Sequence, residues 1–236
     1  MAKFVETFET LDPEKWVVWR GAGTLNICEV AKGKVRFLTG YQGLNGYVVL
    51  CSNKPYLLAN NGVEIDFEMV EGSCGHIMLL IAPYRIRAGI PFYLLKNFDA
   101  VVFEIDAWYR HWAIAYSNRR GFRTAVRKQC PDNVFSGKLR LQNKNGITAF
   151  YFNDVKISES AQLANMNVAT FIQVLAYTDM YFVPRTVEAY VDTFSIDDIG
   201  IAGLGLQWVE MLNTMMVITM LLAFSSIIKK IRRLRE

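Results

Sequence analysis

Three carboxylates alternate along residues 61–72, where the sequence reads NGVEIDFEMVEG. Glu64, Asp66 and Glu68 take every second position, and apolar residues fill the positions between them. Successive side chains of a β-strand point to opposite faces, so this spacing places all three acids on one face of a strand. Two carboxyls that share a face can supply the nucleophile and the general acid of a glycosidase. The same alternation is also typical of an ordinary strand with one wet face.

A second segment, FEIDAW at residues 103–108, repeats the arrangement with Glu104 and Asp106. Trp108, Trp112 and Tyr116 lie in and just after it. Flat aromatic rings beside hydrogen-bond acceptors suit a sugar ligand, so these five residues form a candidate glycan-binding set. In the alternative interpretation the rings are ordinary cross-strand aromatics of a sheet.

The chain around these acids predicts β-strands between residues 3 and 202. Short alternating runs are bounded by turn residues, and no run with helical periodicity is longer than a turn or two. NKNG at 143–146 and ND at 153–154 predict tight hairpin turns. About a dozen strands at this spacing require a two-sheet sandwich or a barrel. The expected strands are 35–40, 46–53, 62–70, 76–83, 100–108, 112–118, 137–143, 147–153, 155–160, 169–178 and 188–201.

Three segments carry a resemblance to a known fold family: FETLDPEKW at 8–16, GKLRLQNKNGITAFYFNDVKIS at 137–158 and VEAYVDTFSIDDIGI at 187–201. They resemble the opening strand, the central hairpins and the closing strand of a concanavalin A-like lectin/glucanase jelly roll. The resemblance spans residues 1–202. It implies an all-β, two-sheet antiparallel jelly-roll sandwich whose first and last strands lie side by side.

Within that superfamily, EIDFE at 64–68 resembles the active-site strand of retaining β-glucanases such as lichenases and xyloglucan-modifying enzymes. The resemblance would make Glu64 the nucleophile, Asp66 its electrostatic modulator and Glu68 the acid/base. Many relatives also hold a structural calcium ion near their terminal strands. Oxygen ligands for such an ion would come from Asp192, Asp197 and Asp198.

The C-terminal segment has a different chemistry. From Met211 to Ile228 the chain runs 18 residues without a charge, which at about 1.5 Å per residue crosses most of a hydrocarbon layer about 30 Å thick. Trp208 stands at the position of an interfacial aromatic residue, and a glycine-containing joint precedes it. We therefore expect a β-sandwich over 1–202, a linker and transmembrane helix over 203–228 and a basic tail over 229–236, in which the basic residues are Lys229, Lys230, Arg232, Arg233 and Arg235.

The charge distribution orients this anchor and excludes one class of partner. The tail alone accounts for the formal net charge of +4, so the β domain is neutral and is not expected to bind nucleic acid. The positive-inside rule places the tail in the cytoplasm or the virion interior and the domain outside. No signal peptide is visible, so a second interpretation keeps the domain on the side of synthesis and lets the tail contact anionic lipid or a nucleic-acid cargo beyond the bilayer.

The four cysteines, Cys28, Cys51, Cys74 and Cys130, show no zinc-binding spacing. Both two disulfides and a fully reduced set are compatible with their number. The basic residues around a probable turn and the strand after it are interpreted as a solvated, charge-balanced sheet edge, with a site for phosphate or an acidic partner as the alternative; they are Arg119, Arg120, Arg123, Arg127 and Lys128.

These observations support two hypotheses about function. In the first, the protein is a non-enzymatic, membrane-anchored jelly roll that acts as a structural or glycan-recognition subunit of a cell envelope or enveloped virion, with other subunits or copies of itself as partners. The acidic alternation occurs in two segments, which favours this hypothesis, because a repeated alternation is typical of the exposed face of a sheet. In the second, it is a membrane-tethered retaining β-glycan hydrolase or transglycosylase that uses Glu64 and Glu68. Neither hypothesis requires a cofactor beyond structural calcium.

Overall fold

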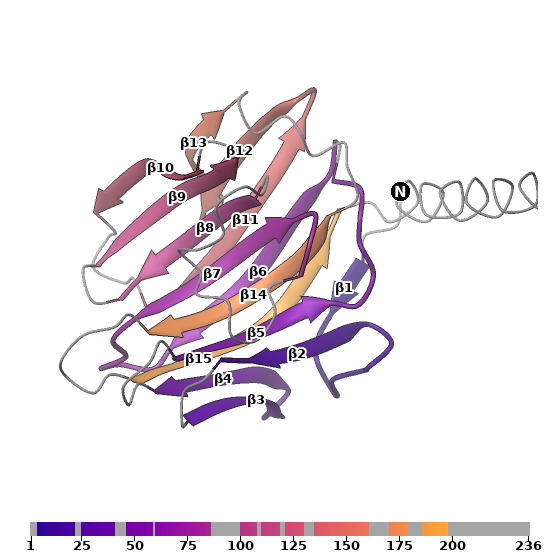
Figure 1. Ribbon diagram of the computed structural model, residues 1–236, viewed down its shortest axis with the longest axis vertical. Coiled ribbons are helices and arrows are strands. Elements are labelled where there is room, and N and C mark those ends of the chain that lie inside the picture. Colours follow the sequence, from indigo (N-terminus) through magenta and orange to yellow (C-terminus); the bar gives the residue numbers. More distant parts are fainter. Residues whose placement is uncertain are drawn as a thin grey trace, which may run out of the picture. The chain divides into compact units, whose positions relative to one another are not determined.

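The computed structural model describes residues 4–21, 25–40, 46–58, 60–85, 100–107, 110–118, 121–129, 135–160, 170–178 and 186–197. The described residues form fifteen antiparallel strands in two sheets (Figure 1). The predicted strand content and the two-sheet sandwich are therefore confirmed. The predicted C-terminal helix, its linker and the basic tail lie outside the described residues.

The first sheet, here sheet A, has the strand order β13-β12-β11-β6-β15-β4-β3, with β1 also paired to β15. Its strands are β1 (Phe4–Glu6), β3 (Leu25–Ala31), β4 (Lys34–Gly40), β6 (Gly62–Met69), β11 (Ser136–Lys144), β12 (Ile147–Phe152), β13 (Val155–Ser160) and β15 (Thr186–Ile196).

The second sheet, sheet B, has the order β10-β9-β8-β7-β14-β5-β2. Its strands are β2 (Trp16–Arg20), β5 (Gly46–Ser52), β7 (His76–Ala82), β8 (Ala100–Asp106), β9 (His111–Asn118), β10 (Gly121–Gln129) and β14 (Phe171–Thr178). The two strands that carry the alternating acids are β6 and β8. Strand β6 lies in sheet A and β8 lies in sheet B.

The first and last strands are neighbours, as the resemblance implied. Phe4 pairs with Ile196 and Glu6 pairs with Phe194 in an antiparallel ladder. The chain divides into two compact units, Met1–Ile199 and Gly200–Glu236, and the predicted membrane span falls in the second. Among the described residues, no helix is long and apolar enough to cross a membrane.

The two predicted hairpin turns form as expected. Asn145 and Gly146 connect β11 to β12 with φ of 52° and 77°, and Asn153 and Asp154 connect β12 to β13 with φ of 48° and 64°. Asparagine, aspartate and glycine tolerate this left-handed region, and a two-residue turn of this kind matches the twist of the flanking strands.

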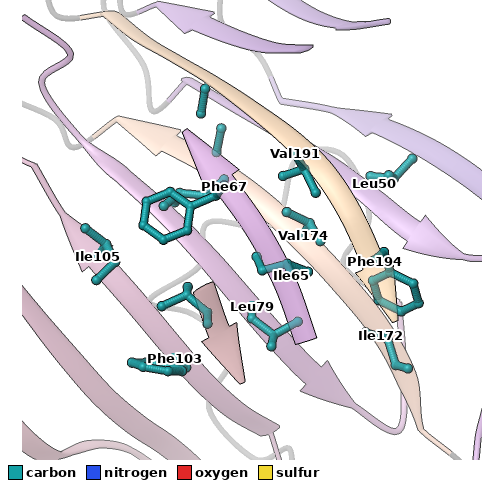
Figure 2. Packing of buried hydrophobic residues seen from close by; sticks show 14 of the residues in the cluster. Leu50, Ile65, Phe67, Leu79, Phe103, Ile105, Ile172, Val174, Val191 and Phe194 are labelled. Atoms are coloured by element: carbon teal, nitrogen blue, oxygen red, sulfur yellow. The ribbon is translucent and has the colours of Figure 1, made fainter. Parts of the chain in front are cut away.

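The core lies between the two sheets, where alternate residues of both point inward (Figure 2). Ile65 and Phe67 come from sheet A, and Leu79, Phe103 and Ile105 come from sheet B. The ring of Phe103 meets that of Phe150 edge to face across the layer, with centroids 5.7 Å apart. Because this layer fixes which residues of each strand point outward, it also fixes where the carboxylates lie.

Candidate functional site

The two Glu-Ile-Asp strands face away from each other. The central isoleucines, Ile65 of β6 and Ile105 of β8, are both fully buried in the core between the sheets. Their acidic neighbours must therefore point outward, from sheet A in one case and from sheet B in the other. The sequence repeats one motif, and the fold places it in two unlike surroundings.

On the outer face of sheet A, cations from β4 and β11 lie beside the predicted catalytic carboxylates of β6. The carboxylate of Glu64 lies 3.6 Å from Lys138 Nζ and 3.4 Å from Arg140 Nη1. Arg140 also donates a 2.7 Å hydrogen bond to Asp197, and Lys34 Nζ lies 3.2 Å from the carboxylate of Glu68. These acids are thus members of a charge-balanced sheet surface.

Asp66 lies between those two glutamates and beside a small hollow. Partial burial raises the pKa of its carboxyl; Lys138 opposes that shift, and the charges of Glu64 and other acids add to it. The hollow has a volume of about 190 Å³ and is lined by Lys34, Asp66, Phe67, Glu68, Ser136, Tyr190 and Asp192. Its charged lining and small size fit a dimple between ion pairs better than a cleft for a sugar chain.

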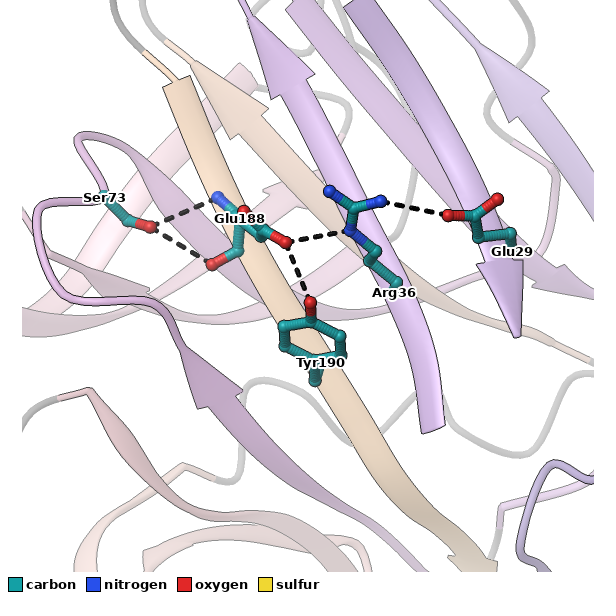
Figure 3. Close-up of polar contacts among 5 residues, drawn as sticks. All are labelled: Glu29, Arg36, Ser73, Glu188 and Tyr190. Carbon is teal, nitrogen blue, oxygen red and sulfur yellow. Dashed lines mark hydrogen bonds and ion pairs between the residues drawn. The ribbon is translucent and has the colours of Figure 1, made fainter. Parts of the chain in front are cut away.

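A further polar network continues across the same face (Figure 3). Arg36 Nε donates to Glu188 Oε1 at 2.8 Å, and Arg36 Nη1 donates to Glu29 at 3.0 Å. The hydroxyl of Tyr190 also donates to Glu188 Oε1 at 2.8 Å. This hydrogen bond first, and Arg36 second, lower the pKa of the Glu188 carboxyl. The network joins β3, β4 and β15 and is structural in character.

On the outer face of sheet B, strand pairing brings four functional side chains into one row. Tyr177 of β14 pairs with His76 of β7, His76 pairs with Asp106 of β8, and Asp106 pairs with His111 of β9. Glu104 lies two residues before Asp106 on the same face of β8. Residues two apart on a strand are separated by roughly 6.7 Å between Cα atoms, so the two carboxyls are close neighbours.

The distances show how tightly this group is arranged. One nitrogen, His76 Nδ1, lies 3.9 Å from Glu104 Oε2 and 3.8 Å from Asp106 Oδ2. On the other side of Asp106, the same Oδ2 atom lies 3.7 Å from His111 Nε2. The ring of Tyr177 lies 5.6 Å from that of His76, centroid to centroid. We call Glu104, Asp106, His76, His111 and Tyr177 the β8 cluster.

The β8 cluster is desolvated. The exposed fraction of the Asp106 side chain is 3%, and that of the Glu104 side chain is 12%. Burial is the main reason that the pKa of His111 is lowered; the charge of Asp106 opposes this effect, whereas Arg127 and His76 add to it. A buried apolar surface continues from the cluster over β5, β7 and β14, formed by Tyr47, Val49, Cys51, Met78, Leu80, Ala82, Ala100, Val102, Leu175 and Tyr177.

A glycine immediately precedes the strand that carries His76. Gly75 has φ of +156°, and a Cβ atom there would lie 2.4 Å from the carbonyl oxygen of Tyr177. The Gly75 carbonyl accepts a 2.9 Å hydrogen bond from the N–H of Ala107, next to Asp106. Close backbone contact of this kind requires glycine and fixes His76 relative to both neighbouring strands.

The predicted ligand residues have different outcomes. Glu104 and Asp106 belong to the β8 cluster, whereas Trp112 is wrong as a ligand residue because its ring packs in the core and is only 4% exposed. Trp108 and the side chain of Tyr116 lie outside the described part of the chain. His76, His111 and Tyr177 were not predicted. Each histidine is the first residue of a strand that pairs with the acidic strand β8. This placement could have identified the two histidines, but it requires the strand order.

The proposed metal ligands do not assemble. Within the described ranges, no group of three or more His, Cys, Asp or Glu residues is arranged to hold a metal ion. Asp192 lies 3.7 Å from Lys34, and Asp197 binds Arg140 instead. Asp198 lies outside the described residues, so the calcium proposal receives no support from Asp192 and Asp197.

The cysteines that the structure describes are thiols. Cys28, Cys51 and Cys74 form no disulfide, and Cys130 lies outside the described residues. Burial raises the pKa of Cys28 and that of Cys51 to about 12 each, so these two thiols are unreactive. Of the two alternatives left by the sequence, the one with two disulfides is thereby excluded.

Comparison with solved structures identifies the fold. The chain is similar to a β-glucanase of Bacillus licheniformis, with a TM-score of 0.61 and 9% identity over 84% of this chain and 99% of that one. It is also similar to the LamA catalytic domain of Zobellia galactanivorans, with a TM-score of 0.61 and 11% identity over 83% and 96% of the two chains. The catalytic domain of an endo-1,3-β-glucanase from Thermotoga petrophila gives a TM-score of 0.61 and 10% identity over 83% and 96%. No family model matches the chain, and no curated protein does.

These neighbours have the concanavalin A-like jelly-roll fold, so the fold expected from the sequence is confirmed. The main functional expectation is contradicted. A non-enzymatic structural or recognition subunit is not what the neighbours represent, because these sandwiches are glucan-degrading enzymes. Identities near 10% show the fold alone and locate no catalytic residue in this chain.

Proposed function

We propose that the protein is a retaining glycan hydrolase whose reacting carboxyls are Glu104 and Asp106 of the β8 cluster. The observation that carries the proposal is that both carboxyls lie within 4 Å of one nitrogen, His76 Nδ1, on a desolvated face. Retaining glycosidases need two carboxyls about 5 to 5.5 Å apart, a spacing that neighbouring outward residues of one strand can provide. The neighbours' substrates suggest a β-1,3- or mixed-linkage β-1,3-1,4-glucan.

The two carboxyls would have separate roles. Glu104 has the longer side chain and the larger exposed fraction, so its carboxylate attacks the anomeric carbon while the glycosidic C–O bond breaks. The departing oxygen takes the proton of the Asp106 carboxyl, which leaves a glycosyl ester on Glu104. Water then cleaves the ester, its hydroxyl goes to the sugar and its proton returns to Asp106.

The surroundings of the two acidic strands favour β8 over β6 for this chemistry. Low dielectric strengthens every electrostatic interaction with a developing charge, and the β8 cluster has the more apolar neighbours. The glutamates of β6 are already neutralised by Lys34, Lys138 and Arg140.

A set of matched variants tests this assignment. Full-length wild-type protein, Glu104→Gln, Asp106→Asn and the control Glu68→Gln are purified in detergent and incubated with laminarin and lichenan, and new reducing ends are counted. Loss of either cluster carboxyl should lower kcat/KM at least about 10³-fold, whereas Glu68→Gln should match the wild type. Activity retained in Glu104→Gln, or no cleavage of any β-glucan by wild-type protein, would overturn the proposal.

We also propose that residues 203–228 tether the enzyme to a bilayer, on the strength of the uncharged run from Met211 to Ile228. The basic tail would stay on the cytoplasmic or interior side. Flotation with liposomes tests the tether: the full chain should float, and a chain ending at residue 202 should remain in the soluble fraction. A full chain that stays soluble without detergent would contradict it.

A further inference from the structure

Strand β1 covers one end of the edge of β15. It has three residues, and its central residue, Val5, pairs with Ser195 (Figure 1). On the same side of β15, opposite β6, strand β4 pairs only with residues 186–191. Without β1, the backbone N–H and C=O groups at residues 194–196 would form an open edge, which is a template for pairing with another strand.

The side-chain contacts that hold β1 in place are weak. Phe4 is partly buried, and its ring meets that of Phe194 edge to face, with centroids 6.3 Å apart. Val5 is 49% exposed. Lys15 Nζ lies 3.0 Å from the carboxylate of Glu6, but the lysine side chain is 46% exposed, and solvent screens an ion pair of this kind. Release of β1 from β15 therefore breaks few buried contacts.

The residue that connects β1 to the rest of the chain has an unfavourable backbone conformation. Phe8 has φ of +48° and is fully buried, with its ring 5.6 Å from that of Trp16. The other non-glycine residues with positive φ in the described ranges are Asn, Asp, Lys or Arg. A bulky aromatic residue is disfavoured in this left-handed region because its Cβ atom crowds the backbone.

A change in φ at Phe8 moves β1 without moving the core. This angle is the rotation about the N–Cα bond, so it turns the residues before Phe8 and can leave the ring of Phe8 in place against Trp16. A return to negative φ removes the unfavourable conformation and directs β1 away from its own β15. Phe8 thus has the properties of a hinge with a fixed side chain.

We propose that two copies of the chain exchange β1, so that β1 of each copy pairs with β15 of the other. The open edge at residues 194–196 fits this strand in the register already observed, and exchange restores each β1–β15 contact in the partner. Relaxation of Phe8 favours the exchanged form, whereas association of two molecules opposes it. Exchange gives the self-association expected from the sequence a specific surface, and it does not depend on the hydrolase proposal.

Two complementary cysteine variants of the full chain test the exchange. Val5→Cys and Ser195→Cys are made separately in a background that carries Cys74→Ser and Cys130→Ser, purified in detergent, mixed and oxidised. Directly opposed residues have Cβ atoms about 4.5–5.5 Å apart, so a small adjustment allows a disulfide. We expect a disulfide between the two substituted positions of different chains, seen as a band of twice the mass and identified by peptide mass spectrometry.

A variant with both substitutions in one chain is the control. Oxidised at high dilution, it should close the disulfide within each chain and lose the dimer that light scattering detects for its reduced form at the same concentration. A disulfide that forms within this variant, with none between the two mixed variants, would overturn the inference. An equal amount of dimer from the oxidised variant would also overturn it, because another surface would then hold the two copies together.

Discussion

The two Glu-Ile-Asp strands are nearly the same in sequence and different in chemistry. On β6 each glutamate lies near a lysine or arginine from β4 or β11, and the row is part of a charge-balanced surface. On β8 both acids lie near His76, Asp106 also lies near His111, and the ring of Tyr177 packs against His76 on a largely buried face. Partners from other strands of the same sheet, rather than the motif, decide what a carboxylate can do.

The largest expected effect concerns what the strands have in common. Ile65 and Ile105 are both fully buried in the same core, so changing either one to alanine should lower the free energy of unfolding by about 3 kcal/mol. Urea unfolding monitored by tryptophan fluorescence measures both. A loss below about 1 kcal/mol at one position would show that Ile65 and Ile105 are not equivalent in the core, and would contradict the view that the two strands differ only in their outward surroundings.

The next effect is specific to β6. Arg140→Met removes the cation that joins Glu64 to Asp197 and leaves the largely buried Glu64 carboxylate with Lys138 alone. We expect a loss of about 2 kcal/mol in stability, since hydrogen bonds to charged groups contribute about 1.5–3 kcal/mol. Glucan hydrolysis measured per folded molecule should be unchanged. If hydrolysis falls with stability held constant, the β6 face belongs to the active site after all.

A smaller effect depends on pH. The hydrogen bond from Tyr190, followed by Arg36, lowers the pKa of Glu188 below its ordinary value. A lowered carboxyl pKa contributes stability that is present above the unfolded-state pKa and is lost as the pH falls through the folded-state pKa. Glu188→Gln should therefore cost about 1 kcal/mol at pH 7 and nearly nothing in strong acid. Thermal melts across that range would refute this if the difference stayed constant.

The smallest expected effect has the opposite sign. Burial raises the pKa of the Asp66 carboxyl above its ordinary value. The group therefore contributes stability only in acid, where the carboxyl is protonated, and this contribution is lost as the pH rises through the folded-state pKa. Asp66→Asn should stabilise the protein at pH 7 by less than about 1 kcal/mol, because solvent screens a partly exposed group. At low pH the two proteins should be equal. A destabilised variant at pH 7 would show that the ionised carboxylate is needed on this face.

Local signals in the sequence predicted much of the fold. Alternation of apolar and polar residues located most strands, because one face of each must be buried. Asn145 and Gly146, like Asn153 and Asp154, fixed two hairpins because they tolerate positive φ. Strands β1, β2 and β3 were not predicted individually, because most of their residues are only partly buried and the alternation there is weak.

The candidate site was harder to predict because it depends on strand order. Nothing in the spacing of His76, Asp106 and His111 along the chain reveals that three adjacent strands bring them into one row. The same limit explains the error at Trp112, whose position beside two acids in sequence says nothing about which face its ring occupies. The carboxylates of β6 matched a motif closely, yet Lys34, Lys138 and Arg140, which neutralise them, come from distant parts of the chain.

Covalent trapping tests the central claim most directly. A 2-deoxy-2-fluoro glycosyl fluoride built on laminaribiose slows the breakdown of a glycosyl ester, so the intermediate accumulates and its position can be read by peptide mass spectrometry. The account predicts an ester on Glu104, in the peptide that contains β8, and none in the peptide that contains β6. An ester on Glu64 or Glu68 would contradict it and return the active site to the face on which the sequence motif first suggested it.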